Sequence, residues 1–324
     1  MNEDRSEQIS STIQLDVGTV VKVLAPATVA NLVCGFDVLG MCLDEPNDLM
    51  EVKLLDEKKI IIHSADGYPL PTDPAQNTAG APLVEMLHEM NNQLGFEVIM
   101  HKKIKPGSGI GSSAASAAGA VVAANHLLGN VFSNQDLVRF AMFGEKVASG
   151  VKHADNIAPC IYGGITLIRS IHPLDIVPIP APGLFITIVH PQIEVRTKDA
   201  RQILRKEVLL KDAIRQWGNI AGLVAGFMQN DFELIGRSLE DVIIEPVRSI
   251  LIPGFDEVKK NCKEAGALGG GISGSGPSIF MLSKTKATAM IVENVMKAVY
   301  DKIGLANNTY VTTINKKGVK ILEE

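Results

Sequence analysis

The sequence has few cysteines, and their spacing is not that of a metal or redox site. Cys34, Cys42, Cys160 and Cys262 are scattered among 324 residues and form no Cys-x-x-Cys pair. This spacing argues against a zinc site and a redox motif. Residues 1–18 are polar and acidic and lack the basic and apolar regions of a signal peptide, so we expect a frayed tail. These features favour a cytoplasmic protein with reduced thiols.

Long apolar runs and long basic runs are also missing. The most apolar run, residues 114–128, is shorter than a membrane span and contains Asn125 and His126, so we interpret it as a buried helix. The net charge is −5, from 31 Lys and Arg against 36 Asp and Glu. We therefore expect no membrane or nucleic-acid partner and favour a small-molecule ligand. The hydrophobic content of 46% suffices for cores in two domains.

Two common nucleotide-binding patterns do not occur. No Gly-x-x-x-x-Gly-Lys-Ser/Thr is present, and the residue that would complete Gly-x-Gly-x-x-Gly after Gly107 and Gly109 is Ser112. A Walker-type NTPase and a dinucleotide-binding fold are therefore not indicated.

The chain has instead a glycine-rich loop between a predicted strand, residues 96–104, and a predicted helix of small residues, 112–128. Its glycines permit positive φ and close approach of a ligand, and a serine at the loop's end is expected to cap the helix. A helix N-terminus offers unpaired N–H groups and a favourable dipole to an anion. We assign phosphate binding to this loop, an ordinary glycine-rich turn being the alternative: Pro106, Gly107, Ser108, Gly109, Ile110, Gly111, Ser112 and Ser113.

Polar side chains in apolar surroundings mark further candidate positions. Asn31 and Asp37 lie six residues apart in an apolar loop predicted after a strand at residues 19–24, where each needs a hydrogen-bond partner. Turn capping is the alternative. Lys102 lies in phase with the apolar residues of its strand, so it needs an anionic or ligand partner unless it snorkels at the strand end.

Two more candidates lie at predicted helix ends. Asn77 precedes a helix predicted over residues 80–94, and it either caps that helix or contacts a nucleotide. Glu145 lies near the end of a helix predicted over residues 134–147. With a serine hydroxyl from the glycine loop it would suit Mg²⁺, which prefers oxygen ligands, although a solvated surface carboxylate is the alternative.

Three motifs resemble those of the GHMP superfamily of small-molecule kinases, which includes galactokinase, homoserine kinase, mevalonate kinase and phosphomevalonate kinase. The loop matches Pro-x-x-x-Gly-x-Gly-Ser-Ser-Ala in register, and residues 269–277 resemble the third motif. Residues 26–37 and 241–255 are similar to segments particular to homoserine kinases, although Val33-Cys34-Gly35 replaces the usual Gly-Pro-Gly. The resemblance extends from about residue 20 to residue 322.

The resemblance implies an α+β fold of two domains, with the active site in the cleft between them. We expect an ATP-binding domain at residues 19–180 and a C-terminal domain at residues 181–324, divided in the proline-rich stretch at 173–182. Within the first domain, alternating apolar residues predict a hairpin from 48–55 and 59–63 and a strand pair over 157–168.

The resemblance also implies roles for individual residues. ATP would lie on the glycine loop with Asn77 and Lys102 beside it, and Mg²⁺ would bind Ser113 and Glu145. Homoserine would contact Asn31, Asp37, His153, Asn156, Thr197, Arg201, Arg248 and Gly274. Thr197 and Arg201 share one helix face by their spacing, a solvated face being the alternative for the arginine. The catalytic group would comprise Ser113, Glu145, Asp155 and Asn156.

Whether Asp155 takes a proton stays open, because phosphoryl transfer depends more on orientation and electrostatics than on proton abstraction. The implied activity is ATP-dependent phosphorylation of the side-chain hydroxyl of L-homoserine to O-phospho-L-homoserine, a step of threonine biosynthesis. A GHMP kinase for another small hydroxylated acid and a catalytically silent ligand sensor are the alternatives. The sequence leaves open whether the chain forms a homodimer.

Overall fold

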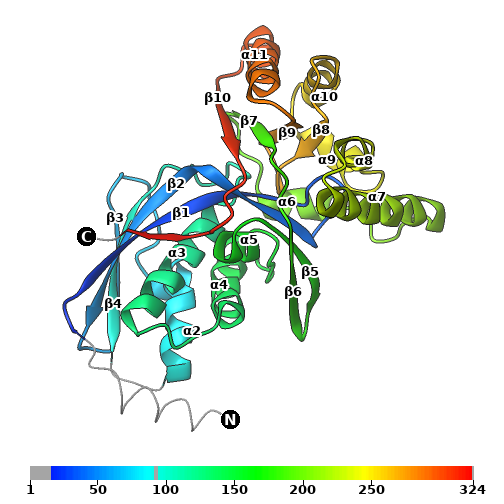
Figure 1. Cartoon of the computed structure of the whole chain (residues 1–324). Coiled ribbons are helices and arrows are strands. Elements are labelled where there is room, and N and C mark those ends of the chain that lie inside the picture. Colours follow the sequence, from blue (N-terminus) through cyan, green and yellow to red (C-terminus); the bar gives the residue numbers. More distant parts are fainter. Residues whose placement is uncertain (1–15, 91–93, 323–324) are drawn as a thin grey trace.

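The computed structural model describes residues 16–90 and 94–322, so most of the predicted tail at residues 1–18 lies outside the described residues. The chain forms two sheets, each accompanied by its own helices (Figure 1). This mixed arrangement confirms the predicted α+β fold.

The larger sheet, which we call the N-terminal sheet, contains seven strands and is covered on one face by helices. The strands run in the order β11-β1-β2-β4-β3, and β5 continues from β2 and pairs with β6. Their bounds are β1 Val20–Ala30, β2 Leu39–Leu55, β3 Ile60–Ser64, β4 Gly95–His101, β5 Ile165–Ile171, β6 Leu174–Ile179 and β11 Lys320–Leu322. The covering helices are α2 Gly80–Met90, α3 Ser112–Leu127, α4 Asn134–Ser149 and α5 Ile157–Tyr162, with a short 3₁₀ turn η1 Pro74–Gln76.

The smaller, C-terminal sheet has four strands in the order β10-β7-β9-β8. Its strands are β7 Phe185–Pro191, β8 Gly269–Ile272, β9 Ile279–Ser283 and β10 Asn307–Thr313. Its helical elements are α6 Thr197–Gln202, α7 Leu210–Gln229, α8 Phe232–Ser238, α9 Glu245–Arg248, η2 Ser249–Leu251, α10 Phe255–Glu264 and α11 Lys286–Ile303. No helix in the described part of the chain is long and apolar enough to span a membrane.

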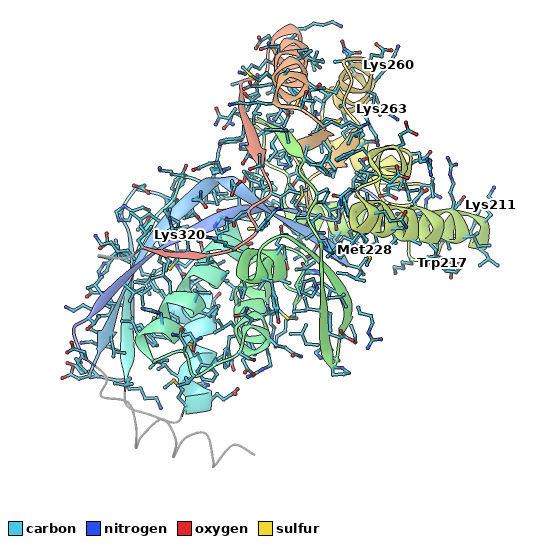
Figure 2. All side chains as sticks on the ribbon, in the orientation of Figure 1. Lys211, Trp217, Met228, Lys260, Lys263 and Lys320 are labelled. Carbon is cyan, nitrogen blue, oxygen red and sulfur yellow. The ribbon has the colours of Figure 1, made fainter. Side chains whose placement is uncertain are left out.

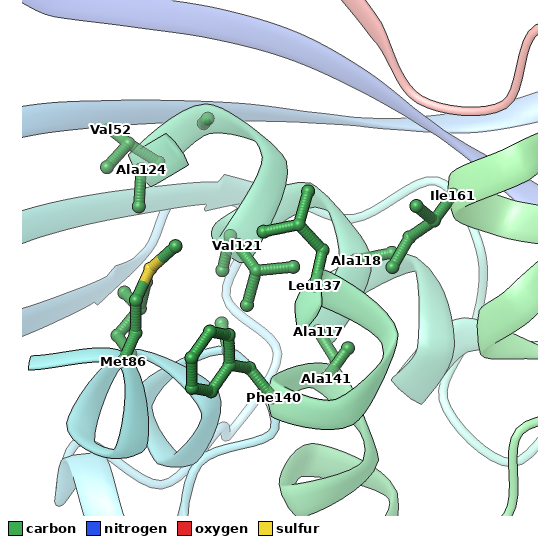
Figure 3. Close-up of a cluster of buried hydrophobic side chains, with 14 of the residues drawn as sticks. Val52, Met86, Ala117, Ala118, Val121, Ala124, Leu137, Phe140, Ala141 and Ile161 are labelled. Atoms are coloured by element: carbon green, nitrogen blue, oxygen red, sulfur yellow. The ribbon is translucent and has the colours of Figure 1, made fainter. Parts of the chain in front are cut away.

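Helix α3 is the centre of the N-terminal core. Its alanines are buried, and Figure 3 shows Val121 among Met86, Leu137 and Phe140 of the neighbouring helices. Small residues allow this close packing: a Cβ added at Gly144 of α4 would lie 2.2 Å from the carbonyl oxygen of Thr78. The packing fixes the position of the α3 N-terminus, where the glycine loop ends.

Several element predictions are wrong in extent or pairing. Strand β1 continues to Ala30 and so covers the first part of the predicted loop. Strands β2 and β3 form no hairpin, because β4 lies between them and pairs parallel with β3. The strand pair predicted over 157–168 is wrong in its first half, which forms α5.

The first residues of the segment that resembles the third motif, 269–272, form β8. The predicted domain division at residue 180 falls between β6 and β7, where the chain passes from one sheet to the other. The last strand nevertheless returns to the N-terminal sheet, pairing Lys22 with Leu322. The division itself stays a prediction.

Candidate active site

A cavity of about 410 Å³ is lined by residues that come from both parts of the chain. Most of the predicted site residues line it: Asn31, Asp37, Lys102, Pro106, Gly107, Gly109, Gly111, Ser112, Ser113, Glu145, His153, Asp155, Asn156, Thr197, Arg201, Arg248 and Gly274. Asn77, Ser108 and Ile110 do not line it. Asn31 and Gly274, which are 243 positions apart in the sequence, thus share one cavity.

The start of α3 offers its first N–H groups without a side-chain cap. The N-cap is Gly111 at φ +72°, so the prediction that Ser112 or Ser113 caps the helix is wrong. Ser112 Oγ instead donates to the Ile104 carbonyl at 2.8 Å, and Ser113 Oγ donates to Glu145 Oε2 at 2.9 Å. With both hydroxyls directed elsewhere, the N–H groups of the first turn remain available to an anion.

The third motif braces the glycine loop. Ser273 Oγ donates to the Gly109 carbonyl at 2.8 Å, and Ser278 Oγ donates to the Ser108 carbonyl at 2.6 Å. A Cβ added at Gly109 would lie 2.5 Å from the carbonyl oxygen of Gly276. The close approach of these two loops therefore depends on a glycine at position 109.

Ser108 and Ile110 are buried, with Ile110 in the apolar core shared with the C-terminal sheet. Neither side chain lines the cavity, so any contact with a ligand would come from their backbone. Asn77 is buried as well. Its Oδ1 accepts from the N–H groups of Ala79 and Gly80, which supports the capping interpretation, and its nucleotide role stays a prediction.

Lys102 has a protein carboxylate as its partner. It forms a buried ion pair with Asp48, and its Nζ also donates to the Ser112 carbonyl at 3.0 Å and to Ser116 Oγ at 2.9 Å. Burial lowers the pKa of Lys102, and the charge of Asp48 opposes this shift. The pair lies under the first turn of α3 and holds it against β4, so the snorkelling interpretation is wrong.

Glu145 is buried beside the glycine loop, so the interpretation as a solvated surface carboxylate is wrong. Burial raises the pKa of Glu145, and the hydrogen bond from Ser113 opposes the shift. A buried carboxylate next to a hydroxyl is a donor pair suited to Mg²⁺, which keeps other positions for water and phosphate oxygens. Among residues 16–90 and 94–322 no group of three or more His, Cys, Asp or Glu forms a metal cluster.

The opposite wall of the cavity carries two arginines around an aromatic ring. Arg201 Nη2 donates to the two carboxylate oxygens of Asp37 at 2.8 and 3.0 Å. Arg248 donates to the carbonyls of Ala200 and Gly274, both at 3.1 Å. The ring of Phe36 lies 5.2 Å from the Arg201 guanidinium and 4.8 Å from that of Arg248. The solvated-face interpretation of Arg201 is therefore wrong.

The positive charges of the two guanidinium groups repel each other. Burial, followed by the charge of Arg201, lowers the pKa of Arg248 to about 10. Phe36 offsets part of this repulsion, because a cation is attracted to the face of an aromatic ring. The wall is therefore set up to receive an anionic group.

Asn31 connects this wall to the third motif. Its Nδ2 donates to the Gly274 carbonyl at 2.8 Å, and its Oδ1 accepts from the Asp37 N–H at 3.0 Å. The backbone between them is unusual: Asn31, Leu32 and Val33 have φ of +71°, +42° and +68°. Such conformations are costly outside glycine, and they persist where packing and function require them. The side chain of Asn31 thus both caps the turn and faces the cavity.

The segment from His153 to Asn156 faces the same cavity. His153 Nδ1 lies 3.5 Å from Asp37 Oδ1, and its Nε2 is buried with no partner among the described residues. Asn156 Oδ1 accepts from Thr28 Oγ1 at 2.7 Å. Burial, with the charges of Asp37 and Glu145, raises the pKa of Asp155 to about 8.

Thr197 Oγ1 lies 3.2 Å from Ser275 Oγ, and this hydrogen bond connects α6 to the third motif. The Nε of Arg201 is also buried without a described partner. Unpaired buried polar atoms are costly, so both Arg201 Nε and His153 Nε2 are consistent with a polar ligand in the cavity.

Sequence reasoning missed several residues that contact the predicted ones, among them Thr28, Phe36, Asp48 and Ser275. Phe36 precedes Asp37 directly in the motif at residues 26–37. This adjacency to a predicted site residue is the feature of the sequence that could have indicated Phe36. Asp48 lies directly across the β2–β4 ladder from Lys102, in the register that pairs Leu49 with His101. The wrong hairpin prediction concealed that pairing.

Two family models match the chain. The GHMP kinases N terminal domain matches residues 78–164, and the GHMP kinases C terminal model matches residues 223–302. The homoserine kinase of Chloroherpeton thalassium is 46% identical over 312 residues, covering 92% of this chain and 98% of that protein. The chain belongs to the homoserine kinase family of GHMP kinases.

Solved structures agree with this membership. The crystal structure of homoserine kinase from Cytophaga hutchinsonii has a TM-score of 0.91 at 48% identity, covering 96% of this chain and 100% of that one. The L. major mevalonate kinase crystallised with R-mevalonate has a TM-score of 0.70 at 14% identity over 93% of this chain and 97% of that one, which shows the shared fold alone.

Proposed function

We propose that the protein transfers the γ-phosphoryl group of ATP to the side-chain hydroxyl of L-homoserine. The observation that carries the proposal is the composition of one cavity. It has an anion-binding helix N-terminus with a buried carboxylate on one wall, and two arginines with a carboxylate on the other. The first wall suits phosphates and the second suits a zwitterion such as an amino acid.

ATP would lie with its phosphates against the N–H groups that begin α3. Gly107, Gly109 and Gly111 leave room for the phosphate oxygens, and Lys102 fixes the first turn of α3 through its hydrogen bond to the Ser112 carbonyl. The magnesium ion would be held by Glu145 and Ser113 and would neutralise phosphate charge when bound. The buried Glu145 carboxylate gains a compensating positive charge in that complex.

Homoserine would be held by its charged groups. Arg248 and Arg201 suit the carboxylate, since a guanidinium fork binds a carboxylate through two parallel hydrogen bonds. Asp37 and Asn31 suit the ammonium group, and Thr197 and His153 complete the pocket. Asp37 is already paired with Arg201, so the ammonium group would share that carboxylate or displace the guanidinium from it.

The hydroxyl of homoserine would be oriented by Asn156 and Asp155. Transfer through a loose transition state depends chiefly on alignment of the acceptor oxygen and on stabilisation of charge. Asp155, with a pKa of about 8, is mostly protonated at neutral pH, so it would act as a hydrogen-bond donor there and as a base only in its ionised fraction.

A substrate panel tests this proposal. Purified protein with MgATP would be given L-homoserine, mevalonate, shikimate or galactose in separate reactions, and ADP release would be followed with a coupled assay. We expect release with L-homoserine well above the rate without acceptor. Release with another compound and not with homoserine would indicate a kinase for a different hydroxylated acid. Release with none would favour a ligand sensor.

A further inference from the structure

Two acidic residues near Arg248 lie outside the active-site cavity. Asp241 and Glu245 are 7 and 8% exposed, and neither of them lines the cavity that Arg248 lines. A buried carboxylate is costly unless it has partners that compensate for its charge. Two buried carboxylates so close to Arg248 in the chain therefore indicate that they serve its position or its charge.

Helix α9 is too short to hold Arg248 in place by itself. It is one turn long, Glu245–Arg248, and Arg248 is its last residue. A first helical turn fixes several residues for a single hydrogen bond, so an isolated turn is unstable in water. The side chain of Arg248 is nevertheless buried and hydrogen-bonded to two carbonyls. Contacts from outside α9 must therefore fix the backbone from which Arg248 extends.

Asp241 fixes the start of this turn. Its Oδ1 accepts hydrogen bonds from the backbone N–H groups of Ile243 and Ile244 at 2.8 and 3.0 Å, and its Oδ2 accepts from that of Glu245 at 2.9 Å. The N–H groups at the start of a helix have no partners within the helix. Burial lowers the pKa of Arg248, and the charge of Asp241 is among those that oppose this shift. Asp241 therefore supports both the backbone and the charge of the arginine.

Glu245 connects the same turn to two other elements. Its carboxylate forms an ion pair with Lys259 of α10. A Cβ added at Gly271 of β8 would lie 2.1 Å from Glu245 Oε2, so the carboxylate lies directly against that strand. Burial raises the pKa of Glu245, and the charge of Lys259 opposes the shift. One side chain thus joins α9 to α10 and to the strand that leads into the third motif.

Lys259 is far less exposed than its neighbour on α10. Its side chain is 22% exposed, whereas that of Lys260 is 74% exposed. Figure 2 shows Lys260 and Lys263 extending from α10 on the outside of the molecule. A buried ion pair is weak evidence for a contribution to stability, because apolar side chains of similar volume often replace it without loss. Such a pair can instead specify one position of the elements that it joins.

The strand that Glu245 contacts leads to a group that orients Arg248. Gly274 follows Gly271 by three residues, and its carbonyl accepts from Arg248 Nη1 at 3.1 Å and from Asn31 Nδ2 at 2.8 Å. A shift of α9 away from β8 would therefore move the guanidinium relative to this carbonyl and to the cavity.

We propose that Glu245, through its ion pair with Lys259, is a positioning residue that holds the guanidinium of Arg248 where it receives the substrate carboxylate. Asp241 supports the same turn from its other end. This role rests on the proposed function, in which Arg248 binds the carboxylate of homoserine. Glu245 and Lys259 act through Arg248 and do not touch the substrate.

Glu245→Gln tests this role, because it removes the charge and keeps the size of the side chain. We expect the KM for homoserine to rise about 5 to 10-fold, part of the value of a hydrogen bond to a charged group, with kcat and the KM for ATP unchanged. Glu293→Gln is the matched control, since it breaks a Glu–Lys pair outside the cavity, and it should leave all three constants unchanged. Steady-state ADP release measures the constants, and thermal unfolding verifies that both variants fold.

The lysine gives a second set of variants, which also serves if Glu245→Gln does not fold. Lys259→Met should raise the same KM, whereas Lys259→Arg keeps a cation beside Glu245 and should leave it close to that of the unmodified protein. Lys260→Met, on the exposed side of α10, is the control. The double variant Glu245→Gln/Lys259→Met should raise the KM no more than either single change, because both remove one interaction.

The possible results are distinguishable. An unchanged homoserine KM in Glu245→Gln and Lys259→Met, in a protein that phosphorylates homoserine, would overturn the positioning role and leave the proposed function standing. A lower kcat at unchanged KM would overturn it as well, because a role in stability alone lowers the amount of folded enzyme. An unmodified protein that does not phosphorylate homoserine would overturn the proposed function and this role with it.

Discussion

At the scale of single residues, the burial of Glu145 is the observation that supports its proposed role at a metal ion. Its carboxylate lies beside the glycine loop, where desolvation raises the pKa, and among the described residues Ser113 Oγ donates a hydrogen bond to it. A buried carboxylate charge lowers the stability of the protein without ligand, and a bound cation compensates for that charge. The proposed roles of Glu145 and Ser113 follow from that position.

Glu145→Ala should lower kcat about 10² to 10³-fold, by analogy with removal of one group that stabilises the transition state. Steady-state ADP release at saturating Mg²⁺ measures the change. Glu293→Ala is the matched control, because Glu293 is a helix carboxylate hydrogen-bonded to Lys297 and Thr309 outside the cavity. Near-normal turnover of Glu145→Ala would refute its metal role.

Arg248→Ala should raise the KM for homoserine by about 10 to 100-fold, the value of one to two hydrogen bonds to a charged group, with the KM for ATP unchanged. Arg248→Lys keeps the charge without the fork and should recover little of the loss. Arg169→Ala removes an exposed arginine of β5 that pairs with Asp175 of β6, and it should leave both constants unchanged. An unchanged homoserine KM in Arg248→Ala would exclude a carboxylate role.

Asp155 makes stability depend on pH. Because its pKa rises from 3.8 to about 8 on folding, the stability it contributes is fully present below pH 4 and is lost as pH rises through 8. Between pH 6 and pH 9 the unfolding free energy should fall by about 2 to 3 kcal/mol more in the unmodified protein than in Asp155→Asn. Urea unfolding of both proteins without ligands measures this. Parallel pH dependences would show that the pKa of Asp155 is not raised.

At the scale of elements, the phosphate loop depends on its contact with the third motif. Gly109 and Gly150 have the same φ of +82°, yet a Cβ at Gly109 would collide with Gly276 whereas one at Gly150 meets open space. Gly150→Ala should therefore cost only the left-handed penalty of about 1 to 2 kcal/mol.

Gly109→Ala should cost more than Gly150→Ala in urea unfolding and should also raise the KM for ATP at least about 10-fold, since the loop must move away from its support. Gly150→Ala should leave that KM unchanged. Equal effects of the two variants on ATP binding would show that the two-loop contact does not shape the phosphate site.

The sequence predicted local elements better than their pairing. The glycine loop, α3 and α4 follow from periodicity and turn residues, which are local properties. Strand β3 pairs in parallel with β4, whose residues lie some 36 positions further along the chain. No local sequence pattern distinguishes this pairing from the predicted hairpin of β2 and β3. The prediction of a serine cap at α3 is wrong for a similar reason. Ser113 Oγ donates to Glu145, 32 residues away in the sequence, and Ser112 Oγ donates to the carbonyl of Ile104 on the preceding segment.

For the whole molecule, the resemblance of the motifs predicts that residues from both parts of the chain share one site, and these residues line one cavity. It could not supply Phe36 or the Lys102–Asp48 pair, because these act through contacts that only the assembled sheets create. In the proposed function, one cavity joins a wall that binds phosphate to a wall that binds the amino acid. This juxtaposition is the central claim about function.

The most direct test of that claim is the phosphorus NMR spectrum of purified protein incubated with MgATP and L-homoserine. The account predicts equal growth of ADP and of a phosphomonoester that co-resonates with O-phospho-L-homoserine, and no such ester when homoserine is omitted. Inorganic phosphate as the only product beside ADP, or a spectrum that does not change, would contradict it.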